Sequence, residues 1–193
     1  MTQQVKETDG RDITLTIHRD IQYMLEKKLK QGVEKYGAKS GEVVVMNPTT
    51  GDILGMARYP SYQQENYYDF PTELYKNPMA ADAYEPGSTF KVLTVSAGID
   101  SGVISPDTQC NICGSAREIS GYTIKTWNDQ YTSNISVKDG LAKSDNIAMI
   151  FIAQKVGSDK FQEYIKNFGI GEPSGVELQE DAGSLVKKNL REI

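Results

Sequence analysis

The sequence predicts an α+β fold in which an antiparallel sheet is flanked by helices. A run of apolar residues at helical spacing over 19–36 is the first observation that predicts it. The second is a pair of β-rich stretches joined by a Pro/Gly turn, which predicts a hairpin over 42–58. The third is the return of helical spacing from Ser88 onward. We expect these elements to form one domain in the 193 residues of the chain.

The chain is predicted to begin with a strand and a helix. Residues 12–17 alternate and are rich in Thr and Ile, which predicts a short strand. The helix over 19–36 is expected to end at Gly37, and His18, the single histidine, is expected at its start. Its apolar stripe consists of Ile21, Met24, Leu25, Leu29 and Val33.

The hairpin is predicted to have strands near 42–47 and 52–58. Because residues 43–46 are apolar on both faces, we expect the first strand to be central in its sheet. A long loop over 59–83 follows, rich in Tyr, Pro and Asn. Its tyrosines either line a groove or, as we prefer, pack within the loop itself.

The second half is predicted to be mainly helical. A helix opens near Ser88, and a turn-rich excursion over 102–136 follows it, with a small strand pair in 121–128. Trp127, the single tryptophan, is expected to anchor the core. The last three helices are predicted over 137–142, 147–156 and 159–168.

Composition excludes several classes of function. A net charge of −5 provides no basic surface for nucleic acid. No stretch approaches about 18 apolar residues, and the N-terminus has no apolar signal-peptide core. If the protein works outside the cytoplasm, we expect its anchor or signal to lie outside this sequence.

Two cysteines, Cys110 and Cys113, form one C-x-x-C in a turn-rich segment. A zinc site would need two further ligands, so we expect no metal here. A thioredoxin-type redox pair would open a helix after a strand. We prefer a structural role, either as two thiols or as a local disulfide.

Ser88 and Lys91 form an S-x-x-K pattern behind a Pro-Gly turn. Positions i and i+3 of a helix share a face, so the hydroxyl and the ammonium should come within reach. A lysine in that place can activate a serine nucleophile, and the helix start favours a developing oxyanion. The pattern alone is common, and Ser184 to Lys187 also fits it.

A second polar cluster, Ser144-Asp145-Asn146, follows 56 residues after Ser88. Ser, Asp and Asn are the preferred helix caps, so the triplet by itself is best explained as a cap. Together with S-x-x-K, however, S-D-N is typical of penicillin-binding proteins and class A β-lactamases.

The chain over 12–183 resembles the front part of the transpeptidase domain of class B penicillin-binding proteins, including those of cell division. Residues 1–11 are a polar lead-in, and 184–193 end abruptly. The landmarks of the resemblance are TLTIHRDIQYMLEKKL, SGEVVVMNPTTGDILGMARYPS, AYEPGSTFKVLT, GYTIKTWN, KSDNIAM and FGIGEPSGVEL. The resemblance implies the serine β-lactamase/transpeptidase-like fold.

The resemblance also implies roles for individual residues. Ser88 would be the acyl-accepting nucleophile, and Lys91 the base, its pKa lowered by apolar neighbours such as Val92 and Leu93. Ser144 would relay a proton to the leaving amine, while Asn146 would bind the substrate peptide and orient Lys91. The substrate would be a peptidoglycan stem peptide ending in D-Ala-D-Ala, and β-lactams would acylate the same serine. No cofactor is implied.

The family's third motif, K-[ST]-G, does not follow Asn146. The one match, Lys39-Ser40-Gly41, precedes the hairpin and is interpreted as coincidence. We therefore expect a fragment, truncated before the later strands, with little or no transpeptidase activity of its own. Losing one oxyanion donor alone costs on the order of 3 kcal/mol of transition-state stabilisation.

Three alternatives to the transpeptidase remain at this point. One is a β-lactam sensor or non-catalytic penicillin-binding module. The others are a β-lactamase, for which Glu163 to Asn167 (EYIKN) lacks the family's Leu, and a D,D-carboxypeptidase. The resemblance places the full-length protein on the outer face of the cytoplasmic membrane, anchored there and working with cell-wall synthesis or division proteins.

Overall fold

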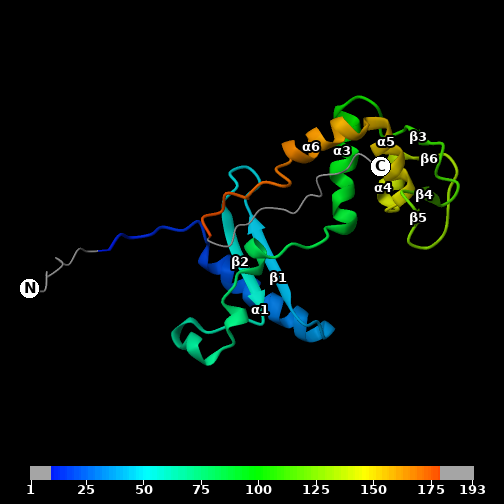
Figure 1. The fold of residues 1–193 in the computed structure, drawn as a ribbon. Coiled ribbons are helices and arrows are strands. Elements are labelled where there is room, and N and C mark those ends of the chain that lie inside the picture. Colours follow the sequence, from blue (N-terminus) through cyan, green and yellow to red (C-terminus); the bar gives the residue numbers. More distant parts are fainter. Residues whose placement is uncertain (1–9, 179–193) are drawn as a thin grey trace, which may run out of the picture. The chain divides into compact units, whose positions relative to one another are not determined.

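The computed structural model describes residues 10–178 (Figure 1). The chain divides into two compact units, Met1–Asp82 and Ala83–Ile193. Residues 1–9 of the polar lead-in and the second S-x-x-K match at Ser184 lie outside the described residues. Within the described part, no helix is both long enough and apolar enough to cross a membrane.

The first unit packs helix α1 (Arg19–Tyr36) on an antiparallel hairpin of β1 (Gly41–Met46) and β2 (Ile53–Tyr59). The helix approaches β2 closely at Gly55, where an added Cβ would lie 2.7 Å from Leu25. Both the helix and the hairpin confirm the sequence prediction. His18 is the N-cap of α1, and Gly37 ends it in the left-handed conformation with φ 62°.

Two strand predictions in this unit are wrong. Residues 12–17 form no strand; the Thr16 hydroxyl and the His18 N–H instead donate to the carbonyls of Ile53 and Leu54. These two isolated hydrogen bonds do not form the repeated pairing of a β-ladder. β1 is not central either, because within the described residues it pairs with β2 alone. Its burial alternates, and Val44 and Met46 are exposed.

The loop after β2 contains short helical turns: η1 (Gln64–Asp69), η2 (Thr72–Leu74) and α2 (Pro78–Ala81). Its tyrosines pack edge to face, with Tyr75 5.3 Å from Tyr62 and 5.8 Å from Tyr67 between ring centroids. The hydroxyl of Tyr75 donates to the backbone carbonyl of Tyr67 at 2.6 Å. These contacts favour the interpretation that the tyrosines pack within the loop, and not the alternative that they line a groove.

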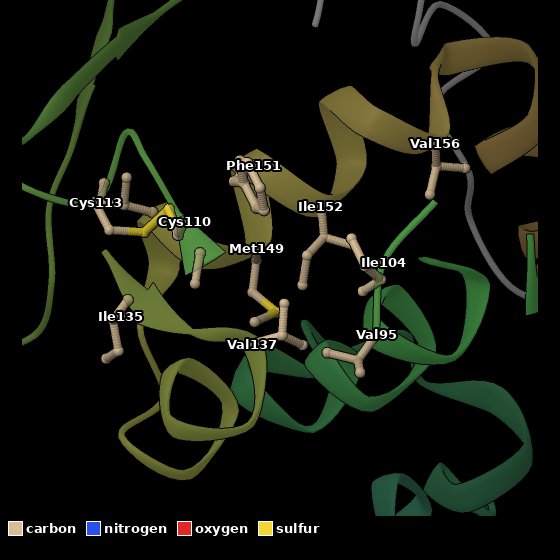
Figure 2. Close-up of a cluster of buried hydrophobic side chains, with 12 residues drawn as sticks. Val95, Ile104, Cys110, Cys113, Ile135, Val137, Met149, Phe151, Ile152 and Val156 are labelled. Atoms are coloured by element: carbon tan, nitrogen blue, oxygen red, sulfur yellow. A yellow bond between two sulfur atoms is a disulfide. The ribbon is translucent and has the colours of Figure 1, made fainter. Parts of the chain in front are cut away.

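The second unit contains the larger core (Figure 2). Its central pair is α3 (Lys91–Asp100) and α5 (Asn146–Val156), which meet where Gly98 leaves no room for a side chain. An added Cβ there would lie 2.7 Å from both Ile104 and Ile152. The remaining elements are η3 (Gly87–Phe90), β3 (Gln109–Cys110), β4 (Arg117–Ile119), β5 (Tyr122–Ile124), β6 (Ile135–Ser136), α4 (Val137–Ala142) and α6 (Ser158–Asn167).

The last three predicted helices are confirmed to within one residue, and the helix predicted to open near Ser88 begins with the 3-10 turn η3 before α3. The small strand pair is present, but β5 pairs with β4, which lies upstream of the predicted segment. Cys110 and Cys113 form a disulfide, fully buried in the core. The prediction that Trp127 anchors the core is wrong, because its side chain is 78% exposed. Thr126 is the buried residue of that segment.

Candidate active site

Ser88 lies on a tight turn at the entrance of α3. It belongs to the 3-10 helix η3, and the α-helix begins three residues later, at Lys91. Gly87 takes a φ of 58°, and the Thr89 hydroxyl donates to the carbonyl of Pro86 at 2.6 Å, which closes the turn. The side chain of Ser88 is exposed.

Ser144 lies on a second tight turn, between α4 and α5. Its backbone has a φ of 57°, and its N–H donates to the carbonyl of Leu141 at 3.0 Å. Asp145 follows as the N-cap of α5, and its carboxylate accepts from the backbone N–H groups of Ile147 and Ala148 at 2.7 and 3.0 Å. The S-D-N triplet is therefore a cap through Asp145, while its two outer residues are left for other contacts.

The two turns are joined by hydrogen bonds through the Ser144 hydroxyl. The Lys91 ammonium donates to the Ser144 backbone carbonyl at 2.6 Å and to its Oγ at 2.9 Å. The Ser144 hydroxyl in turn donates to Ser88 Oγ at 2.9 Å. Spacing predicted a direct approach of Ser88 and Lys91, whereas the hydrogen bonds of the described residues connect them through Ser144. The three residues form one hydrogen-bonded chain.

The pKa of Lys91 is lowered below the ordinary lysine value because burial disfavours the charged ammonium. The nearby carboxylate of Asp145 opposes this shift by stabilising the positive charge. Burial was the predicted cause, but the opposing charge was not predicted. Val92, named as a desolvating neighbour, is itself 56% exposed.

Asn146 is held by a different partner from the one predicted. Its amide nitrogen donates to the backbone carbonyl of Lys125 at 2.7 Å, and no hydrogen bond to Lys91 is present among the described residues. The amide thereby ties the start of α5 to the segment that follows β5. The side-chain oxygen of Asn146 receives no hydrogen bond from residues 10–178.

The described part of the chain contains no candidate metal site. There, no group of three or more His, Cys, Asp or Glu side chains is placed to hold an ion. The Lys39-Ser40-Gly41 match, interpreted above as coincidence, lies in the first unit after α1, and its Gly41 is the first residue of β1. Glu163, considered as a β-lactamase base, lies on the amphipathic helix α6.

Comparison with known proteins identifies relatives of this chain. The family model "Penicillin binding protein transpeptidase domain" matches residues 41–192. A probable peptidoglycan D,D-transpeptidase PbpC of Pseudomonas aeruginosa is 33% identical, aligned over 85% of this chain and 29% of its own length. A probable peptidoglycan D,D-transpeptidase FtsI of Caulobacter vibrioides is 32% identical over 93% of this chain and 30% of its own length.

A similar fold is found among solved structures. A crystal structure of a peptidoglycan glycosyltransferase from Burkholderia ambifaria superposes with a TM-score of 0.77 at 27% identity, covering 90% of this chain and 50% of that one. The chain spans less than a third of the length of the curated relatives named above. On the family match over most of its length, the chain belongs to the penicillin-binding protein transpeptidase domains, of the class B type.

Proposed function

We propose that this chain carries the acyl-transfer site of a serine-type peptidoglycan D,D-transpeptidase. The observation that carries the proposal is the hydrogen-bonded chain from Lys91 through Ser144 to Ser88. It connects an exposed hydroxyl to a half-buried amine of lowered pKa. A weakly basic, partly desolvated lysine is suited to accept a proton from a serine.

In the first step the Ser88 Oγ attacks the carbonyl carbon of the penultimate D-Ala of a stem peptide. With Lys91 as the neutral amine the two hydrogen bonds reverse, so that Ser88 donates to the Ser144 hydroxyl and Ser144 donates to Lys91. The Ser88 proton then passes through Ser144 to the Lys91 amine along the path that these contacts define. The carbonyl oxygen becomes an oxyanion, toward which the backbone N–H of Ser88 supplies one hydrogen bond.

The tetrahedral intermediate then collapses with cleavage of the amide C–N bond. The proton returns through Ser144 to the departing nitrogen, so D-Ala leaves as an amine and an acyl-Ser88 ester remains. In the second step the amine of another strand attacks this ester and regenerates the Ser88 hydroxyl. The product is a new peptide cross-link. β-Lactams acylate Ser88 by the same first step.

The test is covalent labelling by a fluorescent penicillin. The gene product that contains residues 1–193 is incubated with the reagent, and the labelled peptide is identified by mass spectrometry. We expect one label per molecule, on Ser88, and no label in Ser88→Ala. Labelling that persists in Ser88→Ala, or that falls on another residue, contradicts the proposal.

Two variants make the test specific. Ser144→Ala breaks the hydrogen-bonded chain and is expected to slow acylation by 10²-fold or more, on the order of a lost general-base contribution. Ser40→Ala changes the serine of the Lys39-Ser40-Gly41 sequence in the first unit and is expected to leave the rate unchanged.

The 193-residue chain by itself is expected to label weakly, because the K-[ST]-G sequence in it lies upstream of the nucleophile. Stoichiometric labelling of Ser88 in this polypeptide contradicts that expectation. We further propose that the protein acts on the outer face of the cytoplasmic membrane with cell-wall synthesis or division proteins. Its relatives' names, which are those of peptidoglycan D,D-transpeptidases, support this.

A further inference from the structure

A pocket of about 450 Å³ lies beside Ser144, within the second unit. It is formed by the segment after β5 on one wall and the end of α4 on the other. The side chains that matter for its chemistry are Trp127, Asn128, Gln130, Thr132, Lys143 and Ser144. Because Ser144 belongs to the proposed proton relay, whatever occupies this pocket lies next to the reacting atoms.

The indole of Trp127 is presented to solvent by a segment that is held in place. Lys125 forms an ion pair with Asp129 at 3.4 Å, and the buried Thr126 hydroxyl donates to the Gln130 carbonyl at 3.0 Å. Asn146, beside the relay serine, anchors the same segment through the Lys125 carbonyl. An exposed aromatic ring on a braced segment is already ordered for contact, so binding to it costs little conformational entropy.

Charge distinguishes this pocket from an ordinary apolar groove. Lys143 is exposed, and its ammonium has no carboxylate within ion-pair distance among the described residues. The carboxylate of Asp145, on the same wall, is buried and bonded to the backbone of α5. The pocket thus offers an unpaired cation, an aromatic face, and the amide groups of Asn128 and Gln130.

We propose that this pocket binds a carboxylate-bearing segment of the substrate peptide, upstream of its reactive terminus. The Trp127 indole packs against an apolar or planar part of the peptide, the Lys143 ammonium pairs with the carboxylate, and the polar rim bonds backbone amides. The inference rests on the proposed function, because that function supplies the peptide. It assigns Trp127 and Lys143 as determinants of substrate choice.

The experiment uses Trp127 as its own reporter, since it is the single tryptophan of the chain. The 193-residue chain is titrated with the pentapeptide L-Ala-γ-D-Glu-L-Lys-D-Ala-D-Ala while indole fluorescence is recorded. The same titration with the γ-D-Gln peptide removes one carboxylate at constant shape. We expect a saturable change with both peptides and a Kd about 3-fold lower for the acid, as an exposed ion pair provides.

Three variants separate the contributions of Lys143 and Trp127. In Lys143→Met the two peptides are expected to bind equally, whereas Lys143→Arg restores the preference for the acid. Trp127→Ala, followed by calorimetry because it removes the reporter, is expected to weaken both peptides by about 10-fold. Far-UV circular dichroism checks that each variant is folded, and Lys143→Arg provides the test if Lys143→Met is not.

The outcomes distinguish this inference from the proposed function. Ser88→Ala cannot be acylated but is expected to show the same fluorescence titration. If the gene product is not labelled at Ser88 but the fluorescence titration shows the expected binding, the proposed function is wrong and the inference about the pocket is retained. The inference is overturned if no saturable change occurs, if the two peptides bind equally to the unmodified chain, or if Lys143→Met keeps the preference.

Discussion

The two units of this chain differ in what holds them together. In the second unit, 12 apolar side chains from helices and short strands form one buried cluster (Figure 2). In the first unit the buried apolar side chains among the described residues are those of Val33, Ala57 and Pro78. Ile13, Leu15 and Met46 are more than half exposed there. The site lies in the unit that has the core, where packed helices can hold two turns at hydrogen-bond distance.

Apolar patterns in the sequence predicted burial correctly in the second unit but not in the first. Alternation over 12–17 predicted a short strand and apolarity over 43–46 predicted a central one. In the described part of the first unit, however, 12–17 form no strand and β1 is half-buried on one face only. In the second unit the helical periodicity matched the burial, because α3, α4 and α5 pack against one another. Three predictions test this contrast and a fourth tests the titration of Lys91, from the largest expected effect to the smallest.

Removing core volume should affect the second unit strongly. Ile152 is fully buried, and Ile152→Ala is expected to lower the free energy of unfolding by about 3 to 4 kcal/mol, since it leaves a cavity. Val44→Ala, at an exposed site in the first unit, is expected to change it by less than about 0.5 kcal/mol. Hydrogen exchange of the α5 and β1 amides measures both. Similar effects at the two sites would refute the contrast.

Helix capping should separate the units by a smaller margin. Asp145→Ala removes a buried cap that accepts two backbone hydrogen bonds and is expected to cost about 2 kcal/mol. Asn77→Ala removes the cap of the short helix α2, which accepts one, and is expected to cost about 0.5 kcal/mol. Urea unfolding of each variant, followed by hydrogen exchange, provides the comparison. Asp145→Asn, which can still cap, is the control.

Adding one methyl group should have opposite signs in the two units. Gly98→Ala forces a Cβ against Ile104 and Ile152, and we expect a loss of about 1 to 2 kcal/mol. Gly32→Ala, inside α1 with nothing within 4 Å, is expected to stabilise the helix by about 0.5 to 1 kcal/mol. Thermal unfolding of the two variants decides the matter. A gain at Gly98 would mean that α3 and α5 are not tightly packed.

The smallest effect concerns the titration of Lys91. Because its folded-state pKa lies below 10.5, folding disfavours the protonated lysine; this penalty is fully present below the folded pKa and fades as the pH rises toward 10.5. Asp145→Asn keeps a cap but removes the carboxylate that stabilises the ammonium, so the pKa of Lys91 should fall further. NMR of the labelled lysine side chain measures both midpoints. A midpoint that rises in Asp145→Asn contradicts the assignment.

Much of the site followed from the sequence because its determinants are local. Pro86 and Gly87 make a turn before Ser88, and Asp145 is a strong cap wherever a helix follows. The spacing within each motif therefore placed Ser88 and Lys91 on one turn, and Ser144 and Asn146 on another. Nothing local, however, indicated that the Ser144 hydroxyl would lie between the other two side chains.

Taken alone, the sequence determined the helices, the hairpin, the family resemblance and the candidate residues, since each depends on periodicity, turn chemistry or ordered motifs. Only the tertiary structure decided three other features: the hydrogen-bonded chain through Ser144, the bond from Asn146 to Lys125, and the exposure of Trp127. These depend on how segments 20 to 60 residues apart pack together. A tryptophan side chain is apolar, so the sequence by itself favoured burial in the core. The hydrogen-bonded segment after β5 instead places it beside Ser144.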